Sequence, residues 1–593
     1  MGQIKLSKIQ ELVWNVETLT GRKEVNSSKY LSSSSVNSSK EIQLVIEKID
    51  FNYHKNFVIF GIQNIKLISE IYKRKTAFST MIIIEITEED TQSIYLDGEE
   101  NQLGFLEDKR VSLIIGCEDQ LGRQLDIAFN DILKLYNLRN TEILSMPYVK
   151  SKYPVQLSNT LDILFERLHT SIYSYGNDIE DILIGMDNYV NNWHHVFRGL
   201  DCKFFENRYK SKPAIIVGAG PSLDKNIDFL QQAKGKALIF SVDGAMNSLM
   251  NKEIIPDVVS SIERVELTAN FYKKKEIPND VIYVGPNVVL GNIFEKFSRI
   301  IFTGRYGDAL FRNFNESIGF TNINIGINVS HVLIAFARHL GCNPIIFTGL
   351  DLAYTNGRTH TEKFSENFDQ SFMNNYKQNV VYVKGQNGER LESFEHFKHT
   401  KSWIESMIAE DKEAMFINAT EGGANIEGAV NMKLSDVISS YCLEAIPELK
   451  EVYDKAREQQ IYDKEDLTNK AIKFFTDLNE FYENLISESQ AYYDKLLGSK
   501  KTGRLELMES QRLSMDKILN KNWSGRFIVQ SITIAYNRDI HSLPMYLEKE
   551  DEKRMLELNL NYYKTLKAVS KKIMESIDAY IQVLKSHLSD KNI

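Results

Sequence analysis

The sequence predicts an α/β protein: a small Rossmann-like domain, then a Rossmann-like doubly wound central domain, then an α-helical bundle. Short, wholly apolar runs alternate with helical patterns over residues 57–115 and again over 214–420. Beyond about residue 440 the apolar positions instead recur every 3.6 residues. Wholly apolar runs indicate parallel strands buried on both faces, and the 3.6-residue period is typical of amphipathic helices. The expected segments are 1–150 (N-terminal Rossmann-like domain), 151–210 (helical connector), 211–435 (central domain) and 440–593 (helical domain).

The composition is that of a globular protein without a broad nucleic-acid surface. At 593 residues the chain is too long for one hydrophobic core, which favours several domains. A net charge of -9 argues against nucleic-acid binding, which needs a basic face. No apolar run is long enough for a membrane span, and the N-terminus lacks a secretory signal, so we expect a cytoplasmic protein. The four cysteines lack metal-ligand spacing and indicate buried thiols: Cys117, Cys202, Cys342 and Cys442.

The N-terminal region has the strands of a Rossmann-like domain but a poor phosphate turn. A Ser-rich segment, 24–41, reads as a loop or linker, and a helical pattern with Ile62, Ile65, Ile68 and Ile71 follows the first strand. The first turn holds a single glycine, Gly61, and Glu85 follows 24 residues later, where a ribose-binding acid could lie. A scaffold or docking domain without a ligand is the favoured interpretation. The expected strands are Phe57–Phe60, Met81–Ile84 and Val111–Ile115.

The central region predicts a doubly wound parallel sheet, because five or more buried strands alternate with short turns and helices. Ligands of such sheets bind at the carboxyl ends of the strands. The expected strands are Ala214–Val217, Ala237–Val242, Val258–Ile262, Val281–Val284, Arg299–Phe302, Ile345–Phe347 and, as a last candidate, Met415–Thr420.

The C-terminal region predicts long amphipathic helices whose aromatic residues belong to a core. Recognition of a protein partner by their outer faces is possible, but nothing in the sequence requires it. Two helical faces carry the pattern, the first with Leu467, Ala471, Phe474, Leu478, Phe481 and Leu485, and the second with Leu566, Val569, Ile573, Ile577, Tyr580 and Leu584.

The segment IIVGAGPSLD (residues 215–224) carries the clearest phosphate signal. Gly218 and Gly220 follow a buried strand, and glycine allows close approach of a phosphate to the backbone and to a helix N-terminus. Pro221 suits the first helical turn, and Ser222 can add a hydroxyl contact. Leu223 replaces the third glycine of the dinucleotide fingerprint, so a mononucleotide is favoured over a dinucleotide.

Two acids end the next two strands. Asp243 lies 25 residues after Gly218, at the carboxyl end of the neighbouring strand. It is either a ligand contact or a helix N-cap. Glu263 ends the following strand and could equally be a surface acid.

The stretch 326–360 is the richest in polar groups. A turn with Gly326, Asn328 and Ser330 opens a helix, and the loop GLDLAYTNGRTH (349–360) follows the next strand. Loops at strand ends carry binding groups, so this loop is a candidate ligand site. Its candidate phosphate or sugar contacts are Asp351, Tyr354, Arg358 and His360.

Two further histidines, His396 and His399, lie just before a probable helix. Either could act as a base near neutral pH. For each histidine taken alone, an ordinary surface or packing role is the simpler interpretation.

Together these blocks resemble the motility-associated factor (Maf) family of flagellin glycosyltransferases. The resemblance is carried by IIVGAGPSLDKNI, SVDGA, NIGINVSHVLIAFARHLGCNPIIFTGLDLAYTNGRTH and INATEGGANIEGA, over roughly 211–430. It implies that residues 211–435 form a nucleotide-sugar-binding glycosyltransferase domain. The implied reaction moves a nonulosonic acid (pseudaminic or legionaminic type) from its CMP-activated form to Ser or Thr of flagellin, in support of motility.

The same core is similar to Cst-type bacterial sialyltransferases, whose G-x-G-P-S-L loop contacts CMP. The similarity implies that Tyr354 matches the first of two phosphate-binding tyrosines and that His360 replaces the second. It also implies a histidine base, with His399 at the best spacing and His396 second. No Asp-x-Asp pair occurs, so metal-free transfer is reasonable, and a role for Mg²⁺ stays open.

Two other functions compete with this interpretation. The core also resembles archaeal hydroxymethylpterin pyrophosphokinases, which are much shorter and use ATP and Mg²⁺. The third possibility is a non-catalytic flagellar assembly or chaperone factor, against which the complete loop at 349–360 argues.

Overall fold

The computed structural model describes residues 39–86, 104–115, 121, 124–125, 128–129, 132–174, 179–272, 276–305, 307–355, 357–361, 380–460, 462–499 and 504–589. Cys117, Asn356 and most of the Ser-rich segment 24–41 lie outside these residues. The expectation of a loop is wrong for the last residues of that segment, because the helix α2 (Ser39–Ile46) begins there. None of the helices described is long and apolar enough to cross a membrane.

The chain divides into two compact units, each gathered from separate stretches of sequence. Unit 1 combines Met1–Asn177 with Leu485–Ile518 and Val529–Val569. Unit 2 combines Asp178–Asn484 with Leu519–Ile528 and Ser570–Ile593. The C-terminal helices therefore contribute to both units.

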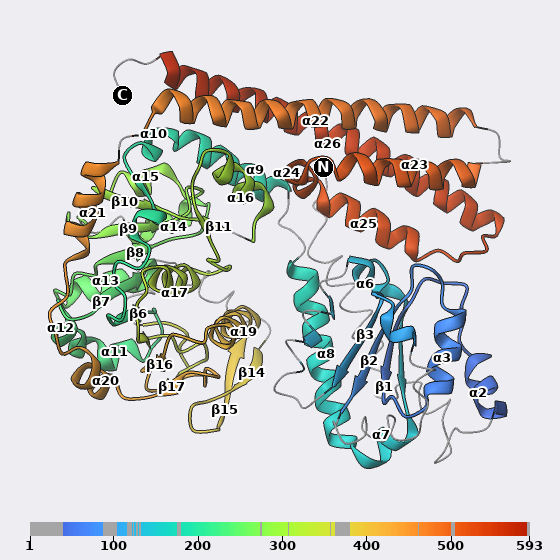
Figure 1. Ribbon diagram of the computed structural model, residues 1–593, viewed down its shortest axis with the longest axis horizontal. Helices are drawn as coiled ribbons and strands as arrows, with labels where there is room; N and C mark the ends of the chain where they lie inside the picture. Colours follow the sequence, from blue (N-terminus) through green and yellow to red (C-terminus); the bar gives the residue numbers. More distant parts are fainter. Residues whose placement is uncertain are drawn as a thin grey trace. The chain divides into compact units, whose positions relative to one another are not determined.

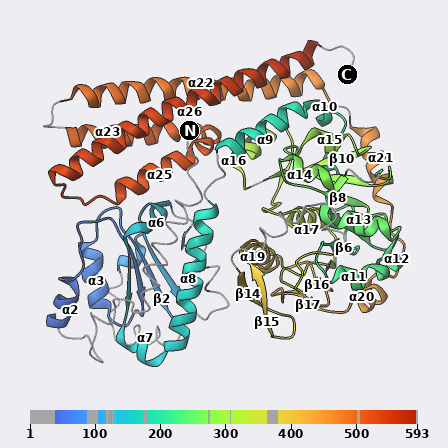
Figure 2. The ribbon, with the colours of Figure 1, turned by 180° about the vertical axis from the view of Figure 1, so that it is seen from behind.

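Unit 1 contains a four-stranded parallel sheet in the order β3-β2-β1-β4. Figures 1 and 2 show helices α2 and α3 on one side of this sheet and α8 on the other. The two central strands, β1 and β2, are buried at every residue, which explains the apolar runs Phe57–Phe60 and Met81–Ile84 within them. The strands are β1 (Asn56–Phe60), β2 (Thr80–Glu85), β3 (Val111–Ile115) and β4 (Thr141–Ser145), and the helices include α3 (Ile65–Arg74), α6 (Ile132–Tyr136), α7 (Pro147–Lys152), α8 (Pro154–Ser174), α23 (Arg504–Leu519) and α25 (Gln530–His541).

The turn after β1 is filled by protein. A Cβ added to Gly61 would lie 2.7 Å from the Tyr148 hydroxyl and 2.8 Å from Val149. Glu85 is fully buried, and its carboxylate accepts hydrogen bonds from the amides of Ile62 (2.8 Å) and Ile86 (3.0 Å) and from the Tyr148 hydroxyl. This arrangement gives Glu85 an internal structural role.

Unit 2 contains a nine-stranded parallel sheet in the order β17-β16-β13-β6-β7-β8-β9-β10-β5. The chain leaves β6 on one side through β7 to β10 and returns on its other side at β13. The change of direction between β6 and β13 is a topological switch point, where open sheets bind ligands. The strands are β5 (Leu200–Asp201), β6 (Ala214–Val217), β7 (Leu238–Val242), β8 (Val258–Ser260), β9 (Ile282–Gly285), β10 (Arg299–Phe302), β13 (Ile345–Thr348), β16 (Phe416–Asn418) and β17 (Val430–Asn431).

Helices and two small ribbons complete unit 2 (Figure 1). Short parallel β11 (Gly304–Arg305) and β12 (Asn322–Ile323) form one pair, and the antiparallel hairpin of β14 (Val380–Lys384) and β15 (Arg390–Phe394) forms another. The helices are α9 (Ile179–Asn191), α10 (Trp193–Val196), α11 (Leu223–Asn226), α12 (Leu230–Ala233), α13 (Asp243–Asn251), α14 (Glu266–Ala269), α15 (Gly291–Phe294), α16 (Ala309–Ser317), α17 (Val329–His339), α19 (Glu395–Glu410), α20 (Leu434–Tyr441), α21 (Leu449–Gln459) and α24 (Trp523–Ile528).

The long C-terminal helices are α22 (Lys464–Gly498) and α26 (Lys549–Ser589). Nearly all the apolar positions expected to face a core are buried, with Phe474 and Val569 partly exposed. Within unit 2, the Tyr580 hydroxyl of α26 bonds Asp187 of α9 at 2.6 Å. The fold class expected from the sequence, two Rossmann-like regions followed by a helical region, is confirmed.

Candidate functional site

The loops that follow β6 and β13 are bonded to each other at the switch point of the unit 2 sheet. The amide of Gly218 donates to the Thr348 carbonyl at 2.8 Å, and the amide of Gly220 donates to the Gly349 carbonyl at 2.6 Å. The two strands are neighbours in register, so their loops leave the sheet side by side. The glycine turn (218–222) and the polar loop (349–360), which the sequence singled out as candidate ligand-binding segments, therefore lie next to each other.

Both glycines after β6 are required by this close approach. A Cβ on Gly218 would lie 2.5 Å from the Gly349 carbonyl oxygen, and one on Gly220 would lie 2.0 Å from Asp351 Oδ2. Real Cβ contacts are never this short, so any side chain at either position must displace the loop after β13. The glycines thus serve the contact between the two loops directly.

The amide groups of Gly218, Gly220 and Ser222 are bonded inside the protein, whereas the sequence predicted that the turn would present open donors to a phosphate. Besides Gly218 and Gly220, the Ser222 amide lies 3.2 Å from Asp351 Oδ1. The helix α11 is four residues long and begins at Leu223, with Ser222 as its N-cap. Pro221 therefore precedes the helix instead of lying in its first turn.

Asp351 is the group that joins the two loops. Its Oδ2 accepts a 2.6 Å hydrogen bond from the Ser222 hydroxyl, and its Oδ1 accepts a 2.8 Å bond from the Thr355 hydroxyl. Asp351 is 1% exposed, and burial raises the pKa of its carboxyl. A carboxylate so placed orients the loops, whereas the sequence analysis placed Asp351 among the ligand contacts.

The loop after Asp351 is held in an unusual backbone conformation. Leu352 has φ of +50° although its side chain is 5% exposed. A left-handed leucine is uncommon and marks a backbone position that its surroundings determine. From the other side, the Ala424 amide donates to the Asp351 carbonyl at 2.7 Å, and a Cβ on Gly423 would lie 2.3 Å from that oxygen.

The end of the loop returns over the glycine turn. The Thr361 amide donates to the Ala219 carbonyl at 2.9 Å. Arg358 Nη1 lies 3.3 Å from Asp224 Oδ2, so the guanidinium pairs with the first turn of α11. Its side chain is 40% exposed and can still meet an anion.

Tyr354, His360 and His396 gather around two phenylalanines. The ring of Phe397 lies 3.9 Å from that of Phe394 and 5.9 Å from that of His360, measured between centroids. Phe394 in turn lies 6.5 Å from the Tyr354 ring and 6.4 Å from the His396 ring. Of the predicted catalytic residues, the structure thus brings Tyr354 and His360 together, and His396 joins them.

The element that carries His396 differs from the one expected. Both His396 and His399 lie inside the first two turns of α19 instead of before a helix. A hairpin that the sequence analysis missed, β14–β15, leads into α19, and its Glu392 carbonyl accepts a 2.7 Å bond from the Tyr354 amide. His399 Nε2 lies 3.5 Å from Glu395 Oε2, one turn earlier in the helix.

The pKa values of these histidines are lowered by their dense surroundings. Burial and then the neighbouring His396 lower the pKa of His360 to about 4. Burial and then His399 also lower the pKa of His396. Both rings are therefore neutral at physiological pH.

The turn before α17 is built around His331, a buried residue that the sequence analysis did not single out. His331 Nδ1 accepts from the Ile327 amide at 3.2 Å, and its Nε2 lies 3.1 Å from the Thr400 carbonyl. Its ring stacks on Trp403 at 4.0 Å. Gly326 has φ of +57°, and a Cβ there would lie 2.5 Å from His331 Nδ1, so Gly326 serves this packing.

Asp243 lies just after β7, where its carboxylate is bonded to neighbouring polar groups. Its Oδ2 accepts a 2.7 Å bond from the Ser261 hydroxyl, which also lies 2.7 Å from the Tyr272 hydroxyl. Burial raises the pKa of Asp243 to about 6. It is the first residue of α13, with Val242 in the N-cap position, so the alternative of a helix N-cap is wrong.

Buried polar atoms mark the same edge of the sheet. Five side-chain oxygens at or just beyond strand ends are buried and make no hydrogen bond within the described part of the chain. Buried polar groups are normally bonded, so such atoms point to groups that a ligand or water would satisfy. They belong to Ser260 (β8), Asn287 (after β9), Thr303 (after β10), Thr348 (β13) and Thr420 (after β16).

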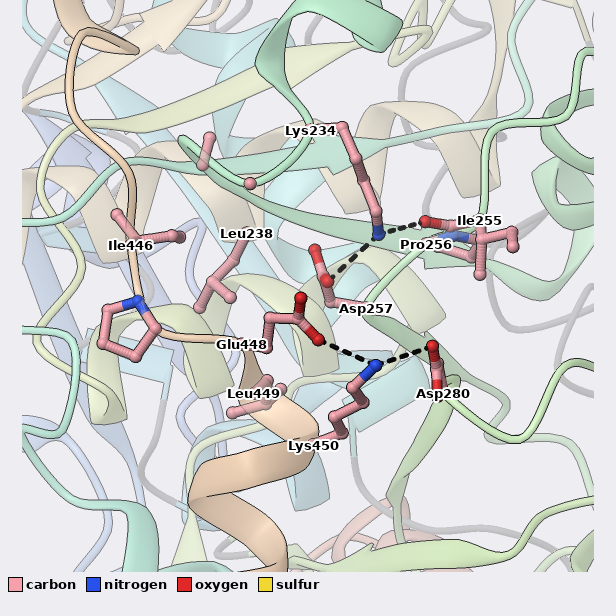
Figure 3. A pocket seen from close by; sticks show the side chains of 13 residues that line it. Lys234, Leu238, Ile255, Pro256, Asp257, Asp280, Ile446, Glu448, Leu449 and Lys450 are labelled. Atoms are coloured by element: carbon pink, nitrogen blue, oxygen red, sulfur yellow. Dashed lines mark hydrogen bonds and ion pairs between the residues drawn. The ribbon is translucent and has the colours of Figure 1, made fainter.

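A different cavity, of about 210 Å³, lies at the opposite, amino edge of this sheet (Figure 3). Its charged groups are already paired, since Lys234 bonds Asp257 at 3.2 Å and Lys450 bonds Glu448 at 2.8 Å and Asp280 at 2.9 Å. The pair of Lys450 and Asp280 fastens the start of α21 to the segment that leads into β9. The cavity is far along the strands from the loops described above and holds none of the predicted site residues.

No cluster of three or more His, Cys, Asp or Glu side chains suited to a metal ion occurs among the residues that the structure describes. The sequence left a role for Mg²⁺ open, and the described residues offer no candidate set of ligands for that ion.

The chain is similar in sequence to one family model and in structure to a solved glycosyltransferase. A family model described as 6-hydroxymethylpterin diphosphokinase MptE-like matches residues 187–357. Among solved structures, the MAf glycosyltransferase from Magnetospirillum magneticum AMB-1 is similar, with a TM-score of 0.60 and 16% identity over 90% of this chain and 82% of that chain. No curated protein matches the sequence. The resemblance predicted from the sequence is thus confirmed at the level of fold: the chain has the fold of a Maf glycosyltransferase, and its central region resembles the MptE-like family.

Proposed function

We propose that this protein is a glycosyltransferase that moves a nonulosonic acid of the pseudaminic or legionaminic type from its CMP donor to Ser or Thr hydroxyls of flagellin. The fold similarity to a MAf glycosyltransferase supports the transferase class. The donor and acceptor come from the sequence resemblance to the Maf and Cst-type families. The contact between the glycine turn and the loop 349–361 at the switch point is the observation that carries the proposal, because it brings the turn expected to bind the nucleotide beside the polar loop expected to supply catalytic groups.

The nucleotide is expected to lie over the ends of β6, β7 and β13. Its contacts would come from the surface of the glycine turn formed by Gly218, Gly220, Pro221 and Ser222, from Asp243, and from the turn of Gly326 and Asn328. Asp351 would hold the turn in place.

Charge that develops on the departing phosphate needs donors. Tyr354 and Arg358 can supply them, and the neutral His360 ring carries one N–H that can bond a phosphate oxygen. Removal of one such donor costs roughly 10²–10³ in rate. A histidine of α19 then takes the proton of the acceptor hydroxyl, which contributes about 10²–10⁴.

A direct assay mixes the purified protein with flagellin and a CMP-nonulosonic acid and weighs the flagellin by mass spectrometry. We expect a mass increase equal to one or more sugar residues and release of CMP, with and without EDTA, since the leaving group carries a single phosphate. Flagellin of unchanged mass, with the protein shown to be folded by circular dichroism, would contradict the proposal.

A second candidate, a 6-hydroxymethylpterin diphosphokinase, is favoured by the family model that matches residues 187–357. The same preparation incubated with ATP, Mg²⁺ and 6-hydroxymethylpterin tests it. Formation of the pterin diphosphate and AMP, without any sugar transfer, would replace the first proposal by this one. If neither the glycosylated flagellin nor the pterin diphosphate forms, the result would indicate a non-catalytic assembly factor.

A further inference from the structure

The side-chain amide of Asn328 makes contacts at both of its polar atoms, and these contacts identify which atom is the oxygen and which is the nitrogen. Its Oδ1 accepts from the Ser330 amide at 3.0 Å and from the Ser330 hydroxyl at 3.0 Å, as the N-cap of α17. Its Nδ2 lies 3.2 Å from His396 Nε2. Because the Ser330 amide can only donate, the Asn328 atom that faces it must be the oxygen, and the atom that faces His396 must be the NH₂ group.

An amide NH₂ group donates and never accepts, so His396 Nε2 must accept. A ring nitrogen that accepts carries a lone pair and no proton, which places the single proton of the neutral imidazole on Nδ1. The N-cap of one helix thereby sets the tautomer of a histidine on another.

We propose that Asn328 is a positioning residue that holds His396 as the Nδ1–H tautomer, with its Nε2 lone pair available, and so makes His396 the base toward the acceptor hydroxyl. This inference rests on the proposed function. In the reaction the hydroxyl takes the place of the Asn328 amide at Nε2. Its proton passes to Nε2 while its oxygen bonds the anomeric carbon, and the bond from that carbon to the CMP phosphate breaks with its electron pair on CMP.

His399 faces a carboxylate instead of an amide group, although its sequence spacing suits the Cst-type base better. Its Nε2 lies 3.5 Å from the Glu395 carboxylate and makes no hydrogen bond to it, so this contact does not fix which ring nitrogen carries the proton. His399 is also not among the rings gathered around Phe394 and Phe397, whereas His396 is.

The charged and titratable groups around His396 favour its neutral form. His360 from the loop after β13, His399 and Glu395 from α19, and His331 from α17 surround it. Burial of the ring, and then the neighbouring His399, disfavour a positive charge on His396. The pKa of His396 is accordingly lowered from 6.5.

The test uses the whole protein labelled with ¹⁵N at histidine, with the His396 signals assigned by their loss in His396→Gln. Long-range proton–nitrogen spectra report which ring nitrogen is protonated, and a pH titration reports the pKa. We expect Nε2 of His396 to be unprotonated above pH 7. A protonated Nε2 in the wild-type protein would overturn the proposal.

Two variants keep the N-cap, since Asp and Ser cap helices about as well as Asn. In Asn328→Asp a carboxylate replaces the NH₂ group, accepts from protonated Nε2 and should raise the pKa of His396 by roughly one to three units. Asn328→Ser is too short to reach His396, so we expect both tautomers and a smaller rise. Asn64→Asp makes the same change at the N-cap of α3, where the side chain caps the Leu67 amide, and should leave the His396 signals unchanged.

The transfer assay adds a second readout. The acid limb of the kcat profile should move upward in Asn328→Asp by the shift found in the titration, while Asn64→Asp keeps the wild-type profile. An unchanged pKa in Asn328→Asp would refute the role of Asn328. Absence of any sugar transfer, with the tautomer as expected, would instead refute the proposed function and leave the contact established.

Discussion

The contact between the loops after β6 and β13 depends on the absence of a Cβ at Gly220. Replacing it by alanine would place a Cβ 2.0 Å from Asp351 Oδ2, and the carboxylate would have to leave Ser222. Overpacking of this kind costs about 1–3 kcal/mol. We expect Gly220→Ala to lower the melting temperature and to weaken CMP binding measured by calorimetry.

Gly104→Ala is the matched control, because a Cβ at Gly104 meets no atom of the described residues within 4 Å. It should leave both CMP affinity and the melting temperature close to those of the wild-type protein. Full CMP affinity in Gly220→Ala would show that the contact between the loops does not shape the nucleotide site.

Asp243 predicts a pH dependence of stability. Burial raises its pKa from 3.8 to about 6, so the folded state binds a proton that the unfolded state releases above pH 4. The contribution of Asp243 to the stability of the folded protein therefore falls as pH rises from about 4 to about 6, and the total loss, reached above pH 6, is about 3 kcal/mol. Asp243→Asn lacks this charge, so its stability relative to wild type should grow over the same interval.

Urea unfolding at pH 4, 5, 6 and 7 measures the difference between Asp243→Asn and wild type. A difference that stays constant across this range would mean that Asp243 titrates normally in the folded protein.

At this scale the sequence located residues better than it assigned their roles. Gly218, Gly220, Ser222 and Asp351 do meet in space, but the sequence could not show that they bond one another. The spacing of the glycines indicates that some group must lie close to the backbone there, but it does not indicate whether that group is a ligand or another loop of the protein. His331 was missed because a buried histidine inside an apolar helical pattern leaves no signal of its hydrogen bonds.

The pairing of α17 with α19 depends on His331. In His331→Phe the stacking on Trp403 can persist, but the Thr400 carbonyl and the Ile327 amide lose their partner. Such losses cost about 1–3 kcal/mol, and we expect this destabilisation at pH 8 in urea unfolding. The loop that carries Asn328 should loosen with it.

The same substitution has a defined pH dependence. The pKa of His331 in the folded protein is about 3, below the ordinary 6.5, so its stabilisation is complete above pH 6.5 and is lost as pH falls. At pH 5 the wild-type protein should have lost roughly 2 kcal/mol that His331→Phe does not lose. An equal difference at pH 8 and pH 5 would contradict the buried neutral histidine.

Among elements, the buried parallel strands were predictable and the edges were not. Every apolar run expected in the central region became a strand, and β6 and β10 have the expected bounds. β5 and β17 are two residues long, too short for any pattern. The hairpin β14–β15 was missed because its strands are largely exposed and carry polar residues, such as Lys384 and Glu392, that no buried-strand pattern includes.

In the whole molecule, segments that are continuous in sequence do not correspond to the compact units of the structure. The helical segment 440–593 supplies residues to both compact units, as Leu485–Ile518 and Val529–Val569 belong to one and Ser570–Ile593 to the other. A continuous helical period reports that a face is buried but not against which partner. The division into segments at residues 150, 210 and 435 therefore stays a prediction about sequence.

We expect the nucleotide to bind where the loops after β6 and β13 meet. Photolabelling with a CMP analogue that carries an azide on the cytosine ring tests it most directly, with the labelled peptides mapped by mass spectrometry and excess CMP as competitor. We expect displaceable label on peptides that contain residues 218–222 or 349–361. Displaceable label confined to the turn at Gly61 in unit 1, or to the amino-edge cavity lined by Lys234 and Lys450, would contradict the account.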